Sequence, residues 1–208
     1  MPDFCREARL AARGILHVAG IDEAGRGPLA GPVVAAAVIL DPDDLPQGLD
    51  DSKKLNAARR ESCFEDIMLR ARAVAVASAP HDVIDALNIR GATLLAMQRA
   101  LAALAHPAGH ALIDGRDVPP GLACPATALV GGDGLSLSIA AASIVAKVSR
   151  DRLMRRLAGA APHWDFACHK GYATGAHRLE ITRHGASPWH RLSFAPFRQT
   201  TLREGGRR

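Results

Sequence analysis

The stretch Ala19-Gly-Ile-Asp-Glu-Ala-Gly-Arg-Gly-Pro28, followed by Leu29-Ala-Gly-Pro-Val-Val-Ala-Ala-Ala-Val-Ile-Leu40, decides how the chain folds. The apolar residues before and after its Gly-Arg-Gly-Pro turn are typical of two buried strands. Two adjacent carboxylates, Asp22 and Glu23, end the first apolar run. The pattern therefore predicts acidic groups at a strand end, beside a turn whose backbone amides are little shielded by side chains.

Beyond these two strands, apolar runs alternate with segments of helical spacing. Asn56 is a suitable N-cap for a helix over 57–70. The order of elements predicts an α/β or α+β fold, in which helices pack on a sheet. The expected strands are 15–21, 33–40, 73–79, 110–114 and 127–132, the expected helices are 57–70, 81–88, 89–105 and 138–157, and short helical patterns follow Pro162.

The charge of the chain is unevenly distributed. The 208 residues carry a net charge of +5, but residues 1–149 carry −3 and residues 150–208 carry +8. A phosphate polyanion would be attracted to the basic part. The alternative is a basic segment that only aids solubility, and charge alone does not separate the two.

The cysteines and the apolar runs indicate a cytoplasmic protein. The four cysteines are widely spaced, which favours reduced thiols over a disulfide framework or a zinc site. No apolar run approaches the roughly 20 residues of a membrane span. The first residues, Met1-Pro-Asp-Phe-Cys-Arg-Glu, do not resemble a signal peptide.

Four acidic residues follow apolar strands: Asp22, Glu23, Asp114 and Asp133. Carboxylates without a His or Cys set favour Mg²⁺ or Mn²⁺ over zinc. Two such ions can activate a water and stabilise the leaving oxygen in phosphodiester cleavage. Each acid alone has a simpler interpretation, as a turn residue or a solvated charge. The metal hypothesis depends on the four together.

The Gly25-Arg26-Gly27 segment also has two interpretations. It can be an ordinary tight turn. It can also let the backbone approach a ribose, whose 2′-hydroxyl distinguishes RNA from DNA.

A series of motifs resembles the type 2 ribonucleases H, and within them the ribonuclease HII family. The motifs occur in the family's order across about 20–195. They are Gly20-Ile-Asp-Glu-Ala-Gly-Arg-Gly-Pro-Leu-Ala-Gly-Pro-Val33, Asp51-Ser-Lys-Lys-Leu55, Asn88-Ile-Arg-Gly-Ala-Thr-Leu-Leu-Ala-Met97, Leu112-Ile-Asp-Gly115, Gly132-Asp133, Ser138-Ile-Ala-Ala-Ala-Ser-Ile-Val-Ala-Lys-Val-Ser-Arg-Asp151, His169-Lys-Gly-Tyr172 and Ser187-Pro-Trp-His-Arg-Leu-Ser-Phe194.

The resemblance implies a ribonuclease H-like mixed sheet flanked by helices, with a small helical C-terminal extension. It implies a catalytic domain over 15–158 and a C-terminal substrate-binding part over 159–198; 199–208 is expected to be a flexible basic tail. The sister type, ribonuclease HIII, carries an extra N-terminal domain. Only a short segment precedes the first motif in this sequence, so the ribonuclease HII family is expected to fit better.

The resemblance also implies the activity. The expected enzyme hydrolyses the RNA strand of RNA/DNA hybrids and incises 5′ of ribonucleotides in duplex DNA. It would use two Mn²⁺ or Mg²⁺ ions, leave 3′-hydroxyl and 5′-phosphate ends, and act in ribonucleotide excision repair. A monomer is expected, because nothing in the sequence calls for a larger assembly.

Motif positions assign the site residues. Asp22, Glu23, Asp114 and Asp133 would be the catalytic metal ligands, Gly25, Arg26 and Gly27 would meet the 2′-hydroxyl, and Tyr172 would stack on the neighbouring sugar, with Lys53 near the acids as a phosphate contact.

Further residues have weaker assignments. Ser143 and Lys147 share a helix face and suit either phosphate contacts or packing, and Arg150 with Asp151 suits structural pairing.

The chain departs from the family pattern at three positions, where Gly131 replaces a usual Lys, Arg116 a usual Asn, and Ala173 a usual Gly. These departures affect the finer substrate contacts. Two other functions remain open: a hybrid-binding module without catalysis, and a small-molecule phosphohydrolase on a related fold.

Overall fold

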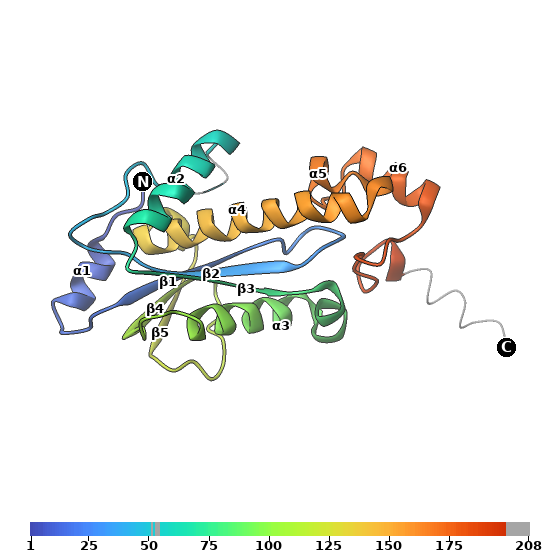
Figure 1. Cartoon of the computed structure of the whole chain (residues 1–208). Coiled ribbons are helices and arrows are strands. Elements are labelled where there is room, and N and C mark those ends of the chain that lie inside the picture. Colours follow the sequence, from blue (N-terminus) through green and yellow to red (C-terminus); the bar gives the residue numbers. More distant parts are fainter. Residues whose placement is uncertain (51, 53–54, 199–208) are drawn as a thin grey trace.

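The centre of the molecule is a five-stranded mixed sheet in the order β3-β2-β1-β4-β5 (Figure 1). The computed structural model describes residues 1–50, 52 and 55–198. β1 pairs antiparallel with β2, and β2 antiparallel with β3, whereas β4 pairs parallel with both β1 and β5. The strands are β1 (Val18–Ala24), β2 (Val33–Ile39), β3 (Ala73–Ala79), β4 (His110–Asp114) and β5 (Ala126–Leu129).

Helices cover both faces of this sheet, which confirms the predicted fold class (Figure 1). α4 (Leu137–Ala160) packs on one face with α2 (Ala57–Arg70) beside it, and α3 (His81–Ala102) covers the other. The remaining helical segments are α1 (Cys5–Ala11), η1 (Gly132–Gly134), η2 (Pro162–Trp164), α5 (Phe166–His169) and α6 (Gly175–His184).

β2 shows why the sheet can be covered on both sides. Alternate residues of a strand point to opposite faces. Ala35 and Ile39 belong to the core on the α3 side, whereas Ala36 and Val38 belong to the core under α4 and α2. All are buried, so the uninterrupted apolar run forms a central strand.

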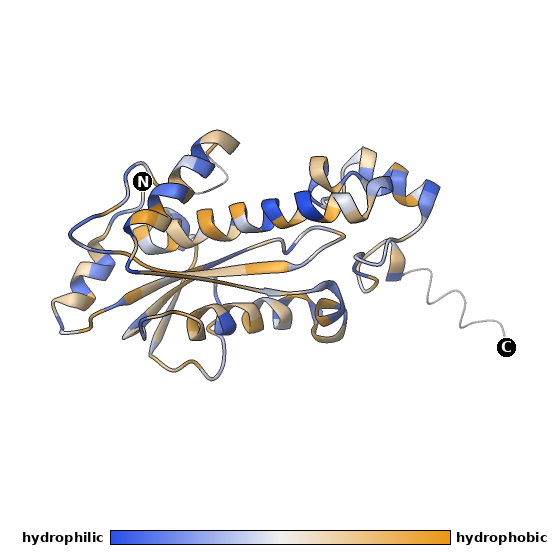
Figure 2. Ribbon diagram, in the orientation of Figure 1, coloured by the Kyte–Doolittle hydropathy of each residue, from blue (hydrophilic) through white to orange (hydrophobic). Residues whose placement is uncertain are grey.

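α4 lies close against β1 because small residues meet there. A Cβ on Gly20 would lie 2.0 Å from the main-chain carbonyl carbon of Ser138, so only glycine fits. Figure 2 shows that α4 is hydrophobic over its first turns and hydrophilic further along. One helix therefore joins the core to the basic C-terminal part.

Two helix boundaries follow the sequence expectation. The side chain of Asn56 accepts a hydrogen bond from the Arg59 amide at 2.9 Å and caps α2. α3 is interrupted at Asn88, which has a φ of 60° and accepts hydrogen bonds from the amides of Arg90 and Gly91. The predicted division between 81–88 and 89–105 is thus confirmed as a capped break within α3.

α1 was not among the expected helices. Its Glu7 is buried and accepts hydrogen bonds from the Ser136 hydroxyl at 2.6 Å and the Ser138 amide at 3.0 Å. A carboxylate at this position satisfies a free amide at the start of α4. The N-terminal segment therefore supports the central helix.

The C-terminal part packs on the far end of α4 (Figure 1). Met154 and Ala161 are buried there with Phe166, and Trp164 and Trp189 pack against them. α4 continues through the predicted boundary at residue 158, and the predicted tail, 199–208, lies outside the described residues. Among the described helices, none combines the length and apolar character needed to cross a membrane.

Candidate active site

Three of the predicted carboxylates meet because β1 and β4 are parallel neighbours. Ile21 pairs with Ile113, which places Asp22 and Asp114 in adjacent positions one residue further along. The sequence had suggested that Asp22 and Glu23 follow the end of the first strand. β1 instead continues to Ala24, so both acids lie within the strand. Asp22, Glu23 and Asp114 line one cleft of about 300 Å³.

Asp22 is the most buried of these three, with 5% of its surface exposed. Burial, together with the negative charges of Glu23 and Asp114, raises the pKa of Asp22 well above its usual value. A hydrogen bond from Ser143 and one from the Glu23 amide, at 2.7 Å, oppose this shift. The ionised site is therefore strained electrostatically and favours a cation.

Asp133 is placed differently from the prediction. β5 ends at Leu129, and Asp133 lies on η1 and not at the end of a strand over 127–132. The adjacent Gly132 amide donates to Oδ1 of Asp114 at 2.7 Å, which ties η1 to the acidic group. Asp133 is buried, and among the described residues it does not line the cleft.

The glycine turn has one glycine that the fold requires and one that leaves space. Gly25 has a φ of 98°, and a Cβ there would lie 2.1 Å from Nε of Arg150. A Cβ on Gly27 would meet no atom within 4 Å. Both line the cleft with Arg26. The turn therefore exposes main chain to whatever the cleft binds.

Tyr172 closes the cleft from the C-terminal part, and 41% of its surface is exposed. Nζ of Lys147 and Cζ of Arg150 lie 5.7 and 5.8 Å from its ring centroid. Lys147 also forms an ion pair with Asp151 at 2.7 Å. The ring thus presents an open face beside two cations.

Two further residues, Ser52 before α2 and Arg60 in its first turn, contribute to the cleft although the sequence suggested no role for them. The Ser52 hydroxyl lies 2.9 Å from that of Ser143, and Arg60 donates to the carbonyl oxygens of Ser52, at 2.8 Å, and Leu55. Ser52 and Arg60 both line the cleft. Lys53, the predicted phosphate contact, lies outside the described residues.

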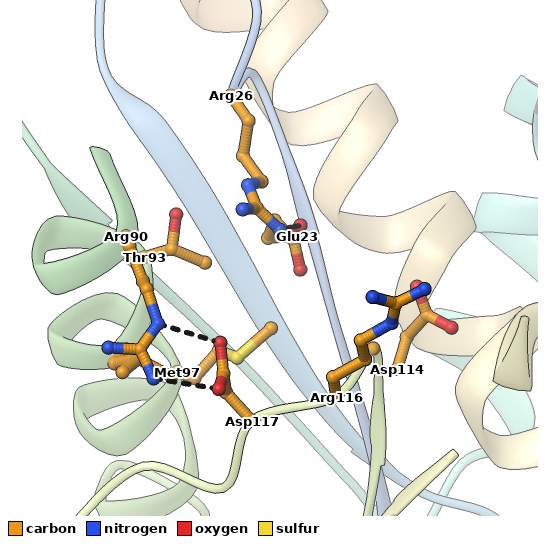
Figure 3. Close-up of a pocket in the computed structure, with 10 residues that line it drawn as sticks. Glu23, Arg26, Arg90, Thr93, Met97, Asp114, Arg116 and Asp117 are labelled. Carbon is orange, nitrogen blue, oxygen red and sulfur yellow. Dashed lines mark hydrogen bonds and ion pairs between the residues drawn. The ribbon is translucent and has the colours of Figure 1, made fainter. Parts of the chain in front are cut away.

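On its other side, the acidic group borders a second pocket surrounded by arginines (Figure 3). Arg26 pairs with Glu23 at 3.3 Å. Arg90 binds Asp117 through two hydrogen bonds of 2.9 and 2.7 Å, which lowers the pKa of Asp117. Arg116 and Asp114 also line this pocket (Figure 3). Carboxylates and cations therefore alternate along this edge.

Two buried arginines hold the site together, and no sequence pattern indicated their partners. Arg150 donates to the carbonyl oxygens of Pro32, Lys170 and Ala30 at 2.9 to 3.1 Å. It is structural, as expected, but its partners belong to the main chain. Arg191 donates to the carbonyl oxygens of Gly31, Arg26 and Gly25 at 2.6 to 2.9 Å.

The donor chemistry of the cleft fits a hard divalent cation. Asp22, Glu23 and Asp114 offer carboxylate oxygens, which Mg²⁺ and Mn²⁺ prefer. Their mutual repulsion, visible in the raised pKa of Asp22, would be relieved by a bound cation. Among the described residues, no group of three or more His, Cys, Asp or Glu side chains has the arrangement of a metal-binding cluster.

Known proteins share both the sequence and the fold. The family model for ribonuclease HII matches residues 19–197. Ribonuclease HII of Brucella ovis is 59% identical over 198 residues, which span 95% of this chain and 90% of that protein, and the Brucella anthropi protein matches equally well.

Solved structures agree. Ribonuclease H2 from Pyrococcus horikoshii has a TM-score of 0.74 at 25% identity, covering 92% of this chain and all 100% of that chain. A ribonuclease HII from Archaeoglobus fulgidus, solved in complex with PCNA, has a TM-score of 0.72 at 30% identity over 86% of this chain and 95% of that chain. Bst ribonuclease HIII in complex with Mn²⁺ shares the fold, with a TM-score of 0.66 at 22% identity over 96% of this chain and 74% of that chain. The chain belongs to the ribonuclease HII family.

Proposed function

We propose that the protein hydrolyses the RNA strand of RNA/DNA hybrids and incises 5′ of single ribonucleotides in duplex DNA, leaving 3′-hydroxyl and 5′-phosphate ends. Family membership makes it a metal-dependent ribonuclease of the H type. One observation carries the finer proposal. A single cleft brings Asp22, Glu23 and Asp114 together with the Gly25-Arg26-Gly27 turn and Tyr172.

Asp22, Glu23, Asp114 and Asp133 would hold the divalent ions, Mn²⁺ or Mg²⁺. Such ions supply a reactive water at neutral pH and stabilise the leaving oxygen. The neighbouring residues keep the ligands in place: Ser143 donates to Asp22, and the Gly132 amide donates to Asp114 at 2.7 Å. Mn²⁺ in the solved Bst ribonuclease HIII supports this choice of ion.

Recognition of the ribonucleotide would use the turn and the tyrosine. The open space over Gly27 allows a sugar to reach the main chain, where a 2′-hydroxyl can form hydrogen bonds. The exposed ring of Tyr172 offers a surface for the next sugar. Lys147 and Lys53 would contact phosphates, and the side chain of Arg26, within the turn, is exposed.

We further propose that the protein works as a monomer in the cytoplasm, in ribonucleotide excision repair. The net charge of +8 over residues 150–208 supports binding to a duplex along the C-terminal part.

The test is cleavage of a duplex with one ribonucleotide and, separately, of a long hybrid, each with Mn²⁺ or Mg²⁺ and with chelator. The proposal expects metal-dependent cuts 5′ of the single ribonucleotide and within the RNA strand of the hybrid. Salt-sensitive binding without any cut would favour the hybrid-binding module. Turnover of free nucleotides with no attack on either polymer would favour the small-molecule phosphohydrolase.

A further inference from the structure

Behind Tyr172 lies a cluster of three buried histidines that the metal chemistry does not use. His169, His177 and His190 have 7%, 0% and 1% of their surfaces exposed. The rings of His169 and His177 stack at 4.0 Å with an angle of 14° between their planes. Each imidazole has two nitrogens, and their partners determine which one carries the proton.

The hydrogen bonds of His177 and His190 run in one direction. The Ser187 amide donates to Nδ1 of His190 at 2.8 Å, so the proton of neutral His190 is on Nε2. That Nε2–H faces Nε2 of His177 at 3.0 Å, which must accept. The proton of His177 is therefore on Nδ1, 2.9 Å from the carbonyl oxygen of Tyr172, to which it donates.

His169 fixes the chain one residue before Tyr172. The Gly171 amide donates to its Nδ1 at 3.1 Å, and its Nε2 lies 3.0 Å from Oε2 of Glu180. The main-chain groups of Gly171 and Tyr172 are therefore held by two stacked imidazoles. The exposed ring of Tyr172 projects from this fixed backbone.

The cluster suits neutral imidazoles. Burial, reinforced by the neighbouring His177, lowers the pKa of His190 to about 4, and burial lowers the pKa of His177. The other titratable groups that act on these two rings are His169, Glu180 and His81. At neutral pH the directed chain of hydrogen bonds is thus complete.

The same segment also holds the glycine turn. Arg191, next to His190, donates to the carbonyl oxygens of Gly25 and Arg26 at 2.6 and 2.9 Å. Its amide donates to the carbonyl oxygen of Leu29. The dipeptide His190-Arg191 therefore connects to both elements that face the cleft. Arg191 binds the glycine turn directly, and His190 reaches the main chain of Tyr172 through His177.

We propose that His177 and His190 are positioning residues, which set Tyr172 relative to the glycine turn and thereby determine how well the enzyme selects a ribonucleotide next to DNA. The effect on cleavage depends on the proposed role of Tyr172. The effect on the position of Tyr172 does not, and it can be measured separately.

The test uses the different geometry of two amides. The amide nitrogen of Asn can replace Nδ1 of a histidine, whereas that of Gln can replace Nε2. Position 177 needs its Nδ1 donor, so His177→Asn should preserve the support of Tyr172 and His177→Gln should lose it. Position 190 needs its Nε2 donor, so the order should reverse: His190→Gln preserves the support and His190→Asn loses it. Side-chain volume alone would favour Gln at both positions.

Two measurements report the outcome. Tyr172 is the only tyrosine of the chain, so 3-fluorotyrosine labelling gives one ¹⁹F resonance for its ring. We expect this resonance to stay near its native position in His177→Asn and His190→Gln and to shift or broaden in His177→Gln and His190→Asn. In the latter pair, kcat/KM for a single-ribonucleotide duplex should fall about five- to tenfold, the size of one lost hydrogen bond, while cleavage of a long hybrid should fall less.

The crossed order of the four variants decides the proposal. If Asn and Gln behave alike at each position, or if Gln is better at both, the directed chain is refuted. If the ¹⁹F resonances follow the crossed order but selectivity does not change, the positioning stands and the role assigned to Tyr172 in the reaction fails. If one position does not tolerate substitution, the order at the other still decides.

Discussion

Nη2 of Arg191 donates to the carbonyl oxygen of Gly25 at 2.6 Å, although 166 residues separate them in the sequence. Arg191 is fully buried, and its guanidinium also donates to the carbonyl oxygens of Arg26, in the same turn, and of Gly31, beyond it. Removing a buried cation from water is costly unless its donors are satisfied. The arrangement therefore couples the C-terminal segment to the shape of the cleft.

We expect Arg191→Lys to destabilise the protein by about 2–4 kcal/mol, because an ammonium cannot serve carbonyl oxygens that a planar guanidinium reaches together. Urea unfolding followed by circular dichroism measures the change. The exposed Arg183 provides the control, since Arg183→Lys should change the free energy of unfolding by less than about 0.5 kcal/mol. Equal effects of the two substitutions would contradict the structural role of Arg191.

The two glycines of the turn should respond differently to alanine. Gly25→Ala places a Cβ 2.1 Å from Nε of Arg150 at a φ of 98°, so the fold must distort. We expect a loss of at least about 3 kcal/mol in stability from the combined strain and overpacking.

Gly27→Ala meets no atom within 4 Å and should leave stability nearly unchanged. Its methyl group would occupy the space through which a sugar reaches the main chain. We therefore expect native urea and thermal midpoints but a raised KM for duplexes that contain ribonucleotides. A native KM for Gly27→Ala would show that the substrate does not approach this side of the turn.

How much the sequence could predict depended on how local each feature is. The uninterrupted apolar run that begins at Val33 and the N-cap at Asn56 are local patterns, and the structure confirms the elements they indicate. The meeting of Asp22 with Asp114 followed from strand ends in a sheet. The partners of Arg191 are carbonyl oxygens, which every residue has, so no residue type could reveal them.

Asp133 shows the same limit on a smaller scale. The apolar residues up to 130 predicted a strand that continued to the acid, but pairing with β4 stops at Leu129. Gly131, with a φ of 65°, then turns the chain into η1. The hydrogen bond from the Gly132 amide to Asp114 holds the chain where β5 has ended. A contact between residues this far apart cannot be predicted from a local sequence pattern.

Asp22→Asn should separate stability from catalysis. The amide keeps an oxygen for the Glu23 amide but removes a buried charge that Glu23 and Asp114 repel. We expect the metal-free variant to be more stable than the native protein by about 1 kcal/mol. We also expect it to lose cleavage while retaining hybrid binding.

Thermal unfolding with and without Mn²⁺ tests the cause. The ion should raise the midpoint of the native protein by binding only the folded state, and raise that of the variant much less. Retained turnover in Asp22→Asn, or equal stabilisation of both proteins by Mn²⁺, would remove Asp22 from the metal site.

The histidine cluster predicts how stability depends on pH. His190 has a pKa of about 4 in the folded protein, mainly because of burial, against an ordinary 6.5. Between these values the unfolded chain binds the proton more readily, so the stabilisation is fully present above 6.5 and is lost as pH falls toward 4. The expected loss is about 2–3 kcal/mol, and the lowered pKa of His177 acts in the same direction.

Urea unfolding at intervals from pH 7.5 to 4.5 measures this loss of stability. His190→Gln removes one titrating group and should flatten the decline, whereas His184→Gln, at an exposed position, should not. An unchanged slope in His190→Gln would mean that His190 titrates normally in the folded state.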